Sequence, residues 1–397
     1  MNRSATLFAV AVVLVSAMGF TSSAHAVKSE VYGFVMTDIR YDAEAKDPAW
    51  FDVMRPTKLP VVDNGFGESG NTSFSVRQTR FGIKSFIPTD MGELKTQFEW
   101  ELFGTGVDAG QTTLRLRHAY GELGQFGAGQ TWSPFMDIDV FPNSIEYWGP
   151  SGMAFFRNVQ ARWMPKQGDS RITIAIERPG ASADQGEYAD RVELANVVPR
   201  FPVPDLSAEW RHAGNWGYVE LAGIAREIAW DDLDPTGPDI SDEVIGWGLH
   251  ASSNIKFSNS VIRLSVLHGE GIQNYMNDAP EDIGTEPDPD NPGFPKGVAI
   301  PVTGVVAFLD HNWNSKWATS IGYSMVDIDN TEGQLPSAFK RGDYALVNAL
   351  YTPVPNLMLG PEVQWIQREN KGGGDKTDNV AVQFSFKYSF SSMIGGD

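Results

Sequence analysis

Apolar and polar residues alternate along most of the chain with a period of two. The alternation is clearest near the C-terminus, where one set of alternate positions is apolar: Val380, Val382, Phe384, Phe386, Tyr388 and Phe390. The intervening set is Ala381, Gln383, Ser385, Lys387 and Ser389. Because successive side chains of a strand point to opposite faces, this pattern predicts strands with one apolar face. Similar stretches at 93–102, 171–177 and 317–325 indicate an all-β fold.

The predicted strands are joined alternately by short and long links. The short links are 87–92, 124–125, 165–169, 213–217, 257–259, 314–315 and 353–355. The long links are 42–72, 104–112, 132–156, 179–205, 230–243, 271–299, 329–341 and 369–376. Such a pattern is typical of an outer-membrane barrel, whose periplasmic turns are short and whose external loops are long. It predicts a transmembrane antiparallel β-barrel of about sixteen strands, and the proline-rich stretch 192–205 is assigned to a loop.

The first residues have the pattern of a secretory signal peptide. Arg3 precedes an apolar run from Leu7 to Phe20, and the small-residue motif Ala24-His25-Ala26 follows. This predicts a signal peptide at 1–26 and a barrel domain at 27–397, in preference to a short membrane anchor. The predicted location is the outer membrane of a Gram-negative bacterium, in contact with lipid and lipopolysaccharide.

Charge and composition exclude several classes of function. The formal net charge is -19 and there is no Cys, which argues against nucleic-acid binding and excludes disulfides and thiolate chemistry. Most of the negative charge falls in the links 42–72, 230–243 and 271–299, so the barrel wall is closer to neutral. No spacing indicates a metal site or a cofactor.

Aromatic residues near predicted strand ends suit the interface between membrane and water. The expected girdle consists of Trp100, Trp132, Trp163, Trp210, Trp230, Trp313, Trp317 and Tyr388. The alternative is that these rings are ordinary core residues.

The strand phase predicts which charged residues face the lumen. If Leu114, Leu116 and Tyr120 face lipid, Arg115 and Arg117 point inward. The same argument places further arginines inside, at Arg162, Arg171, Arg211 and Arg263. Arg77 and Arg80 differ in phase from each other, and a bulge near Thr79 would reconcile them.

The link 132–156 is too apolar for an exposed loop, and we expect it to fold into the barrel as a constriction loop. Its acids Asp137, Asp139 and Glu146 would then face Arg115, Arg117, Arg157 and Arg162 across the pore, with Tyr147 and Trp148 nearby. Opposed rows of charge select permeants by sign and dipole. The alternative is that the arginines form ion pairs with wall acids such as Glu99 and Glu101.

Several segments resemble the DcaP-like porins. They are the residues 76–82, 92–99, 107–113, 116–121, 128–133, 139–143 and 147–150. The resemblance implies a homotrimeric sixteen-stranded channel whose arginine-lined pore favours small anionic solutes such as dicarboxylates. Arg77, Arg80, Arg115 and Arg117 lie in the matching motifs and are the leading pore residues.

The expected function is therefore passive diffusion of small, preferentially anionic solutes, including aromatic acids, without catalysis. A sugar-specific porin is one alternative, although most aromatic residues fall on the lipid phase. A barrel hydrolase is another, but none of its five His residues after the predicted signal peptide lies in a G-x-S-x-G or H-E-x-x-H context.

Overall fold

The computed structural model describes residues 27–234, 239–374 and 376–395. The predicted signal peptide at 1–26 lies outside the described residues, as do 235–238 of the link 230–243. Among the described residues no helix is long and apolar enough to cross a membrane.

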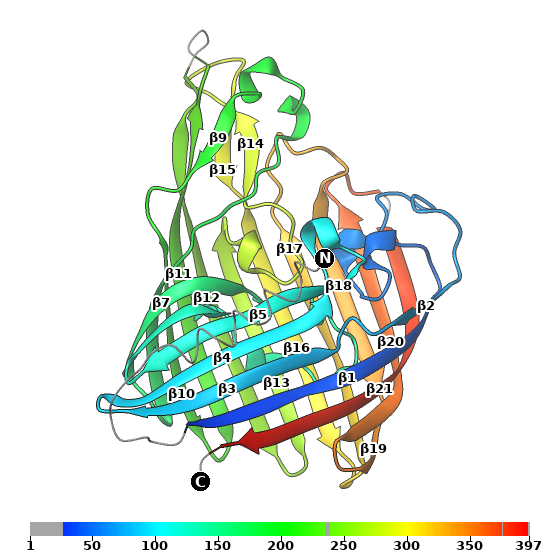
Figure 1. Cartoon of the computed structure of the whole chain (residues 1–397). Helices are drawn as coiled ribbons and strands as arrows, with labels where there is room; N and C mark the ends of the chain where they lie inside the picture. The colour runs from blue at the N-terminus through cyan, green and yellow to red at the C-terminus, as the bar shows by residue number, and fades with distance from the viewer. Residues whose placement is uncertain (1–26, 235–238, 375, 396–397) are drawn as a thin grey trace, which may run out of the picture.

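The chain forms a closed antiparallel barrel of 16 spans, which confirms the predicted fold and strand number (Figure 1). The first eight spans are β1 (Lys28–Asp42), β2 with β3 (Asn71–Ser75 and Arg80–Thr89), β4 (Gly92–Phe103), β5 (Thr112–Leu123), β6 (Phe126–Trp132), β7 (Arg157–Lys166), β8 (Ser170–Glu177) and β10 (Asp205–Gly214). The other eight are β11 (Gly217–Asp232), β12 (Asp242–Phe257), β13 (Ser260–Glu270), β16 (Pro301–Asn312), β17 (Trp317–Ile328), β18 with β19 (Phe339–Asn348 and Leu350–Val354), β20 (Leu357–Asn370) and β21 (Lys376–Ile394). The barrel closes where β1 pairs with β21, from Ser29 opposite Ile394 to Asp42 opposite Ala381.

The remaining elements lie in the long external loops. Three strands belong to a tower that rises above the barrel (Figure 1), namely β9 (Val197–Arg200), β14 (Ile283–Pro287) and β15 (Pro295–Ala299). The 3-10 helices are η1 (Pro48–Trp50), η2 (Pro56–Lys58), η3 (Gly106–Asp108), η4 (Ile138–Val140), η5 (Gly186–Tyr188), η6 (Val192–Leu194) and η7 (Gln273–Tyr275). Residues 192–204 are thus outside the barrel spans, as predicted, although they contain η6 and the short edge strand β9, whereas Asp205 already begins β10.

The alternation of the sequence becomes the two faces of the barrel wall. On β21, Val382 and Tyr388 are exposed on the outside, whereas Gln383 and Ser385 are fully buried. Leu114 on β5 is 70% exposed. In a membrane the apolar outer face meets hydrocarbon and the polar set points inward, which is the reverse of a soluble sandwich.

An irregularity between β2 and β3 explains the conflicting phases of the two N-terminal arginines. Asp38 of β1 pairs with Ser75, and Phe34 pairs with Arg80, so five residue steps face four. The extra residue is a bulge at 76–79, where the Thr79 N–H donates to the Val76 carbonyl at 3.0 Å. Both Arg77 and Arg80 therefore point to the inside.

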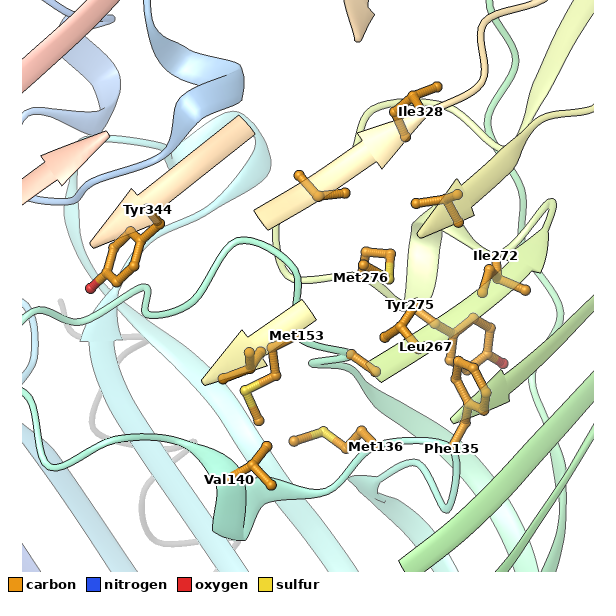
Figure 2. Close-up of a cluster of buried hydrophobic side chains, with 14 of the residues drawn as sticks. Phe135, Met136, Val140, Met153, Leu267, Ile272, Tyr275, Met276, Ile328 and Tyr344 are labelled. Atoms are coloured by element: carbon orange, nitrogen blue, oxygen red, sulfur yellow. The ribbon is translucent and has the colours of Figure 1, made fainter. Parts of the chain in front are cut away.

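The largest buried apolar cluster lies inside the barrel. It joins the loop 133–156, through Phe135, Met136, Val140 and Met153, to wall residues such as Leu267 of β13 and Tyr344 of β18. Figure 2 shows Phe135 beside Tyr275, with Leu267, Ile272 and Met276 nearby, whereas Tyr344 lies to one side of this group. Burial of this apolar surface holds the loop inside the lumen, at roughly 25 cal/mol per Å² removed from water.

Candidate functional site

Three loops, not one, enter the barrel from its external end. The loop 133–156 was expected there, and the structure adds parts of 43–70 and 271–282. They are tied together by an ion pair of 2.7 Å between Arg55 and Asp278. The Trp148 Nε1 also donates to the Asn277 carbonyl at 2.8 Å. The constriction is therefore a bonded assembly of three loops.

Cavities follow one another through this assembly. A cavity of about 270 Å³ is lined by Arg80, Arg117, Tyr147 and Lys387 among others. It shares Tyr147 and Phe155 with a second cavity of about 410 Å³, which Arg115 and Arg157 also line. The second shares Arg55 and Ala279 with an outer cavity of about 520 Å³. Neighbouring cavities thus share lining residues, from the external loops to the arginines of the wall.

Three arginines of the wall share two carboxylates. Arg117 bonds Glu99 at 2.6 Å and Glu101 at 2.8 Å. Arg80 and Arg115 bond the same Glu101, at 3.2 Å and, from the Arg115 Nε, at 3.0 Å. The predicted alternative of pairing with wall acids is thus present, and three positive charges against two negative ones leave the cluster positive.

Tyr147 connects the constriction loop to this cluster. Its hydroxyl donates to Glu101 and accepts from Arg115. Its ring stacks on Phe103 of β4, with centroids 4.0 Å apart. The loop is therefore fixed against the arginine side of the wall at Tyr147, the residue that lines both the first and the second cavity.

Arg157 differs from the other pore arginines. None of the ion pairs among the described residues includes it, although Glu101 and two arginines lie near enough to act on its charge, and its buried Nη1 has no hydrogen-bond partner. Its guanidinium instead lies 4.7 Å from the ring centroid of Trp132 and 5.9 Å from that of Phe155. Arg157 therefore lines the second cavity with one buried nitrogen whose hydrogen bond is unsatisfied.

Lys387 is the corresponding cation in the first cavity. Its Nζ lies 4.2 Å from the ring centroid of Phe34, and none of the described carboxylates forms an ion pair with it. Lys387 belongs to the inward phase of β21, so its position was visible in the alternation. The position of Arg55, in contrast, could not be predicted from the sequence, because it depends on how the external loops pack against one another.

Arg77 is not a pore residue, contrary to the prediction. It is 1% exposed and bonds Asp52 at 2.6 Å and the carbonyls of Gly104 and Gln111. Its guanidinium lies over Phe103 at 3.9 Å. Arg77 is on the inside as expected, but it fastens two external loops to the wall and has no surface left for a solute.

The expected opposition of loop acids and arginines across the pore is also wrong. Asp137 accepts from Tyr218 and Ser252, and Asp139 from Arg211. These partners belong to the wall behind the loop, because the apolar residues of the loop pack against that wall and carry the acids with them.

Two further residues of the predicted site, Glu146 and Arg162, also form hydrogen bonds that hold the loop or the wall together. Glu146 accepts from the backbone N–H groups of Met54 and Gly149, at 2.9 and 2.5 Å, and from Tyr344. Arg162 faces the interior but bonds Gln160 and the Trp132 carbonyl rather than a loop acid. Neither residue forms the predicted charge pair across the pore.

The aromatic set divides into two groups. Several of its members are exposed on the outer face or at its turns, as expected: Trp163, Trp210, Trp313, Trp317 and Tyr388. Trp132 points inward instead, at 5.0 Å from His118 and 5.1 Å from Phe155. Trp230 packs on Gly297 in the external tower.

The outer cavity lies among external loops, where burial shifts the pKa of two side chains. Burial, followed by the neighbouring Arg55, lowers the pKa of Lys58. Burial, followed by Asp184, raises the pKa of Glu281. Both shifts favour the neutral forms of these two groups. Arg55 and Arg368 line the same cavity, and Arg368 donates to three backbone carbonyls.

A closed barrel with an apolar outer face, inward loops and a series of polar cavities defines an outer-membrane channel. The chain matches the family described as DcaP outer membrane protein over residues 14–379, and it belongs to that family. None of the curated proteins matches it.

Solved structures share the fold. The outer membrane channel DcaP of Acinetobacter baumannii aligns with a TM-score of 0.75 at 20% identity, over 94% of this chain and 99% of that one. An anion-selective porin from Comamonas acidovorans aligns with a TM-score of 0.58 at 9% identity, over 92% and 100%. OmpT of Vibrio cholerae, in a trimer form, aligns with a TM-score of 0.56 at 12% identity, over 92% and 99%.

Proposed function

We propose that this channel allows passive diffusion of small solutes with a preference for anions. The observation that carries the proposal is the charge of the second cavity, where the guanidinium of Arg157 lies against aromatic rings and Arg115 shares its carboxylate with two other arginines. A positive lining attracts anions and repels cations most strongly where the walls exclude water.

The proposed permeants are small carboxylates, including dicarboxylates and aromatic acids. A planar guanidinium binds a carboxylate through two parallel hydrogen bonds. Arg157 lies against the rings of Trp132 and Phe155, which offer an apolar surface beside that charge. A second cation, Lys387, lines the next cavity and would receive the anion beyond Tyr147.

The proposed assembly is a homotrimer surrounded by outer-membrane lipid and lipopolysaccharide. Its support is the shared architecture with a trimeric porin and the apolar outer face of the wall. We further propose that the chain is not an enzyme. His250, the histidine nearest the constriction loop, bonds the Phe135 carbonyl and Ser265 through its two ring nitrogens, so a carboxylate does not orient it as a catalytic base.

The test is the zero-current potential of the purified channel in a planar bilayer across a potassium chloride gradient. We expect the sign of an anion-selective pore. Arg157→Gln should reduce the anion preference several-fold, whereas Arg200→Gln, in the exposed edge strand β9, should leave it unchanged. A cation-selective sign, or equal effects of the two variants, would overturn the proposal. Flux of neutral sugars exceeding that of carboxylates of equal size would favour a sugar-type porin.

A further inference from the structure

The barrel wall has a window on one side of the arginine cluster. β5 pairs with β6 from Ala119 opposite Gln130 to Leu123 opposite Phe126. β6 continues for two more residues, to Trp132, paired with β7 alone, and the chain then turns into the lumen. Within the described residues no strand pairs with this edge of β5 at 112–118, although its other edge pairs with β4.

The second pore cavity reaches this window. Its lining includes Leu116 and Gln130, which flank the window, together with Arg115 and Arg157. The side chain of Gln130 donates to the carbonyls of Leu116 and Arg117 at 3.3 and 3.1 Å, which caps two positions of the free edge. The wall of the pore is therefore incomplete beside its cations in a single copy of the chain.

A free strand edge does not remain open to hydrocarbon. Unpaired backbone groups cost several kcal/mol each in lipid, and open sheet edges do not occur there. Leu114 and Leu116, whose side chains lie on the outer face of this edge, are 70% and 39% exposed, so the edge borders the apolar outer face. Arg115 and Arg157 would also lie close to lipid, which is unfavourable for charge. Where the outer face of β5 meets lipid, this edge therefore needs a cover.

The tip of the first external loop has the chemistry of such a cover. Residues 61–70 are all exposed, and they include the apolar side chains Val61, Val62 and Phe66, the last 43% exposed. Exposed apolar groups in an external loop are typical of a contact surface. The acids Asp63 and Glu68 flank Phe66 and complement the arginines at the window.

The base of this loop holds its tip away from the window of the same barrel. The Thr377 hydroxyl donates to the Pro60 carbonyl at 2.7 Å, and Asn370 donates to the Val61 carbonyl at 2.9 Å. These contacts fasten the loop over β20 and β21, and it projects beyond β2 (Figure 1). The strands β1, β3 and β4 separate it from β5.

We propose that a second copy of this chain covers the window, with the 61–70 tip of one copy lying over the free edge of β5 in the next. Because two different patches meet, the contact is heterologous, and three such contacts close into a ring. The inference rests on the proposed homotrimer and adds that the pore of each copy is complete only when its neighbour is present.

The absence of native Cys makes the contact testable by cross-linking. The full-length channel carrying Phe66→Cys and Leu114→Cys, refolded in lipid, should form covalent oligomers in most chains on mild oxidation, and these should disappear on reduction. A second pair, Val62→Cys with Leu116→Cys, tests the same contact at other positions, in case the first two sulfur atoms are too far apart to form a disulfide. The matched control is Phe66→Cys with Leu249→Cys, because Leu249 of β12 is also exposed on the outer face, at 63%.

The outcomes separate this inference from the proposed function. Cross-links in either window pair and not in the control would support it. A stable trimer in which neither window pair cross-links would overturn the inference and leave the trimer intact. A protein that native mass measurement shows to be monomeric would overturn both the inference and the trimer, while the anion preference would still be decided by the bilayer potential.

Discussion

The Tyr147 hydroxyl donates a hydrogen bond to Glu101, the carboxylate that three wall arginines share. One residue of the constriction loop is thereby joined to the cluster of charges on the opposite strands. The loop position and the charge of the pore are coupled through this contact.

Removal of the Tyr147 hydroxyl should loosen the loop without removing charge. Tyr147→Phe keeps the ring on Phe103 but loses a hydrogen bond to a charged group, a change of about 1.5 to 3 kcal/mol. We expect larger fluctuations of single-channel current and a nearly unchanged anion preference. A loss of preference equal to that of Arg157→Gln would show that Tyr147 contributes to selectivity directly.

Glu101→Gln should increase the anion preference. The substitution removes a negative charge that now offsets Arg80, Arg115 and Arg117, so the cavities become more positive. The measurement is the ratio of chloride to potassium permeability, with Asp231→Asn on the external tower as the control. A lower ratio would mean that Glu101 acts chiefly by holding the arginines in place.

Arg77→Gln should affect folding rather than permeation. The substitution leaves Asp52 buried and unpaired, which typically costs about 3 to 5 kcal/mol. We expect a lower midpoint of urea unfolding in lipid, and unaltered selectivity in the channels that remain folded. Altered selectivity with normal stability would show that Arg77 acts on permeating solutes after all.

Glu146→Gln should destabilise the constriction. Both carboxylate oxygens of Glu146 accept hydrogen bonds, from Met54, Gly149 and Tyr344, and the amide nitrogen of Gln would face donors instead of accepting from them. We expect faster proteolysis of the loop 133–156 in the folded barrel. Asn143→Asp, a loop substitution away from these donors, is the matched control, and equal proteolysis of both variants would contradict the role of Glu146.

The sequence could predict the parts of this fold that depend on local periodicity. The alternation on β21 and the order of short and long links predicted sixteen spans, because a strand in lipid must bury one face and expose the other. The inward direction of Arg115 and Arg117 followed from the same phase. The bulge at 76–79 could be suspected but not located, since one extra residue leaves little trace in composition.

The alternation of residues by itself determined a barrel with an arginine-bearing interior and a loop too apolar to remain outside. Tertiary structure alone decided which arginines line a cavity: Arg77 is buried in an ion pair with Asp52, whereas Arg157 lies against aromatic rings at the edge of the second cavity. It also decided that Asp137 and Asp139 face the far wall. The physical reason is that phase fixes the side of a strand on which a residue lies, while its partners depend on how loops distant in sequence pack across the lumen.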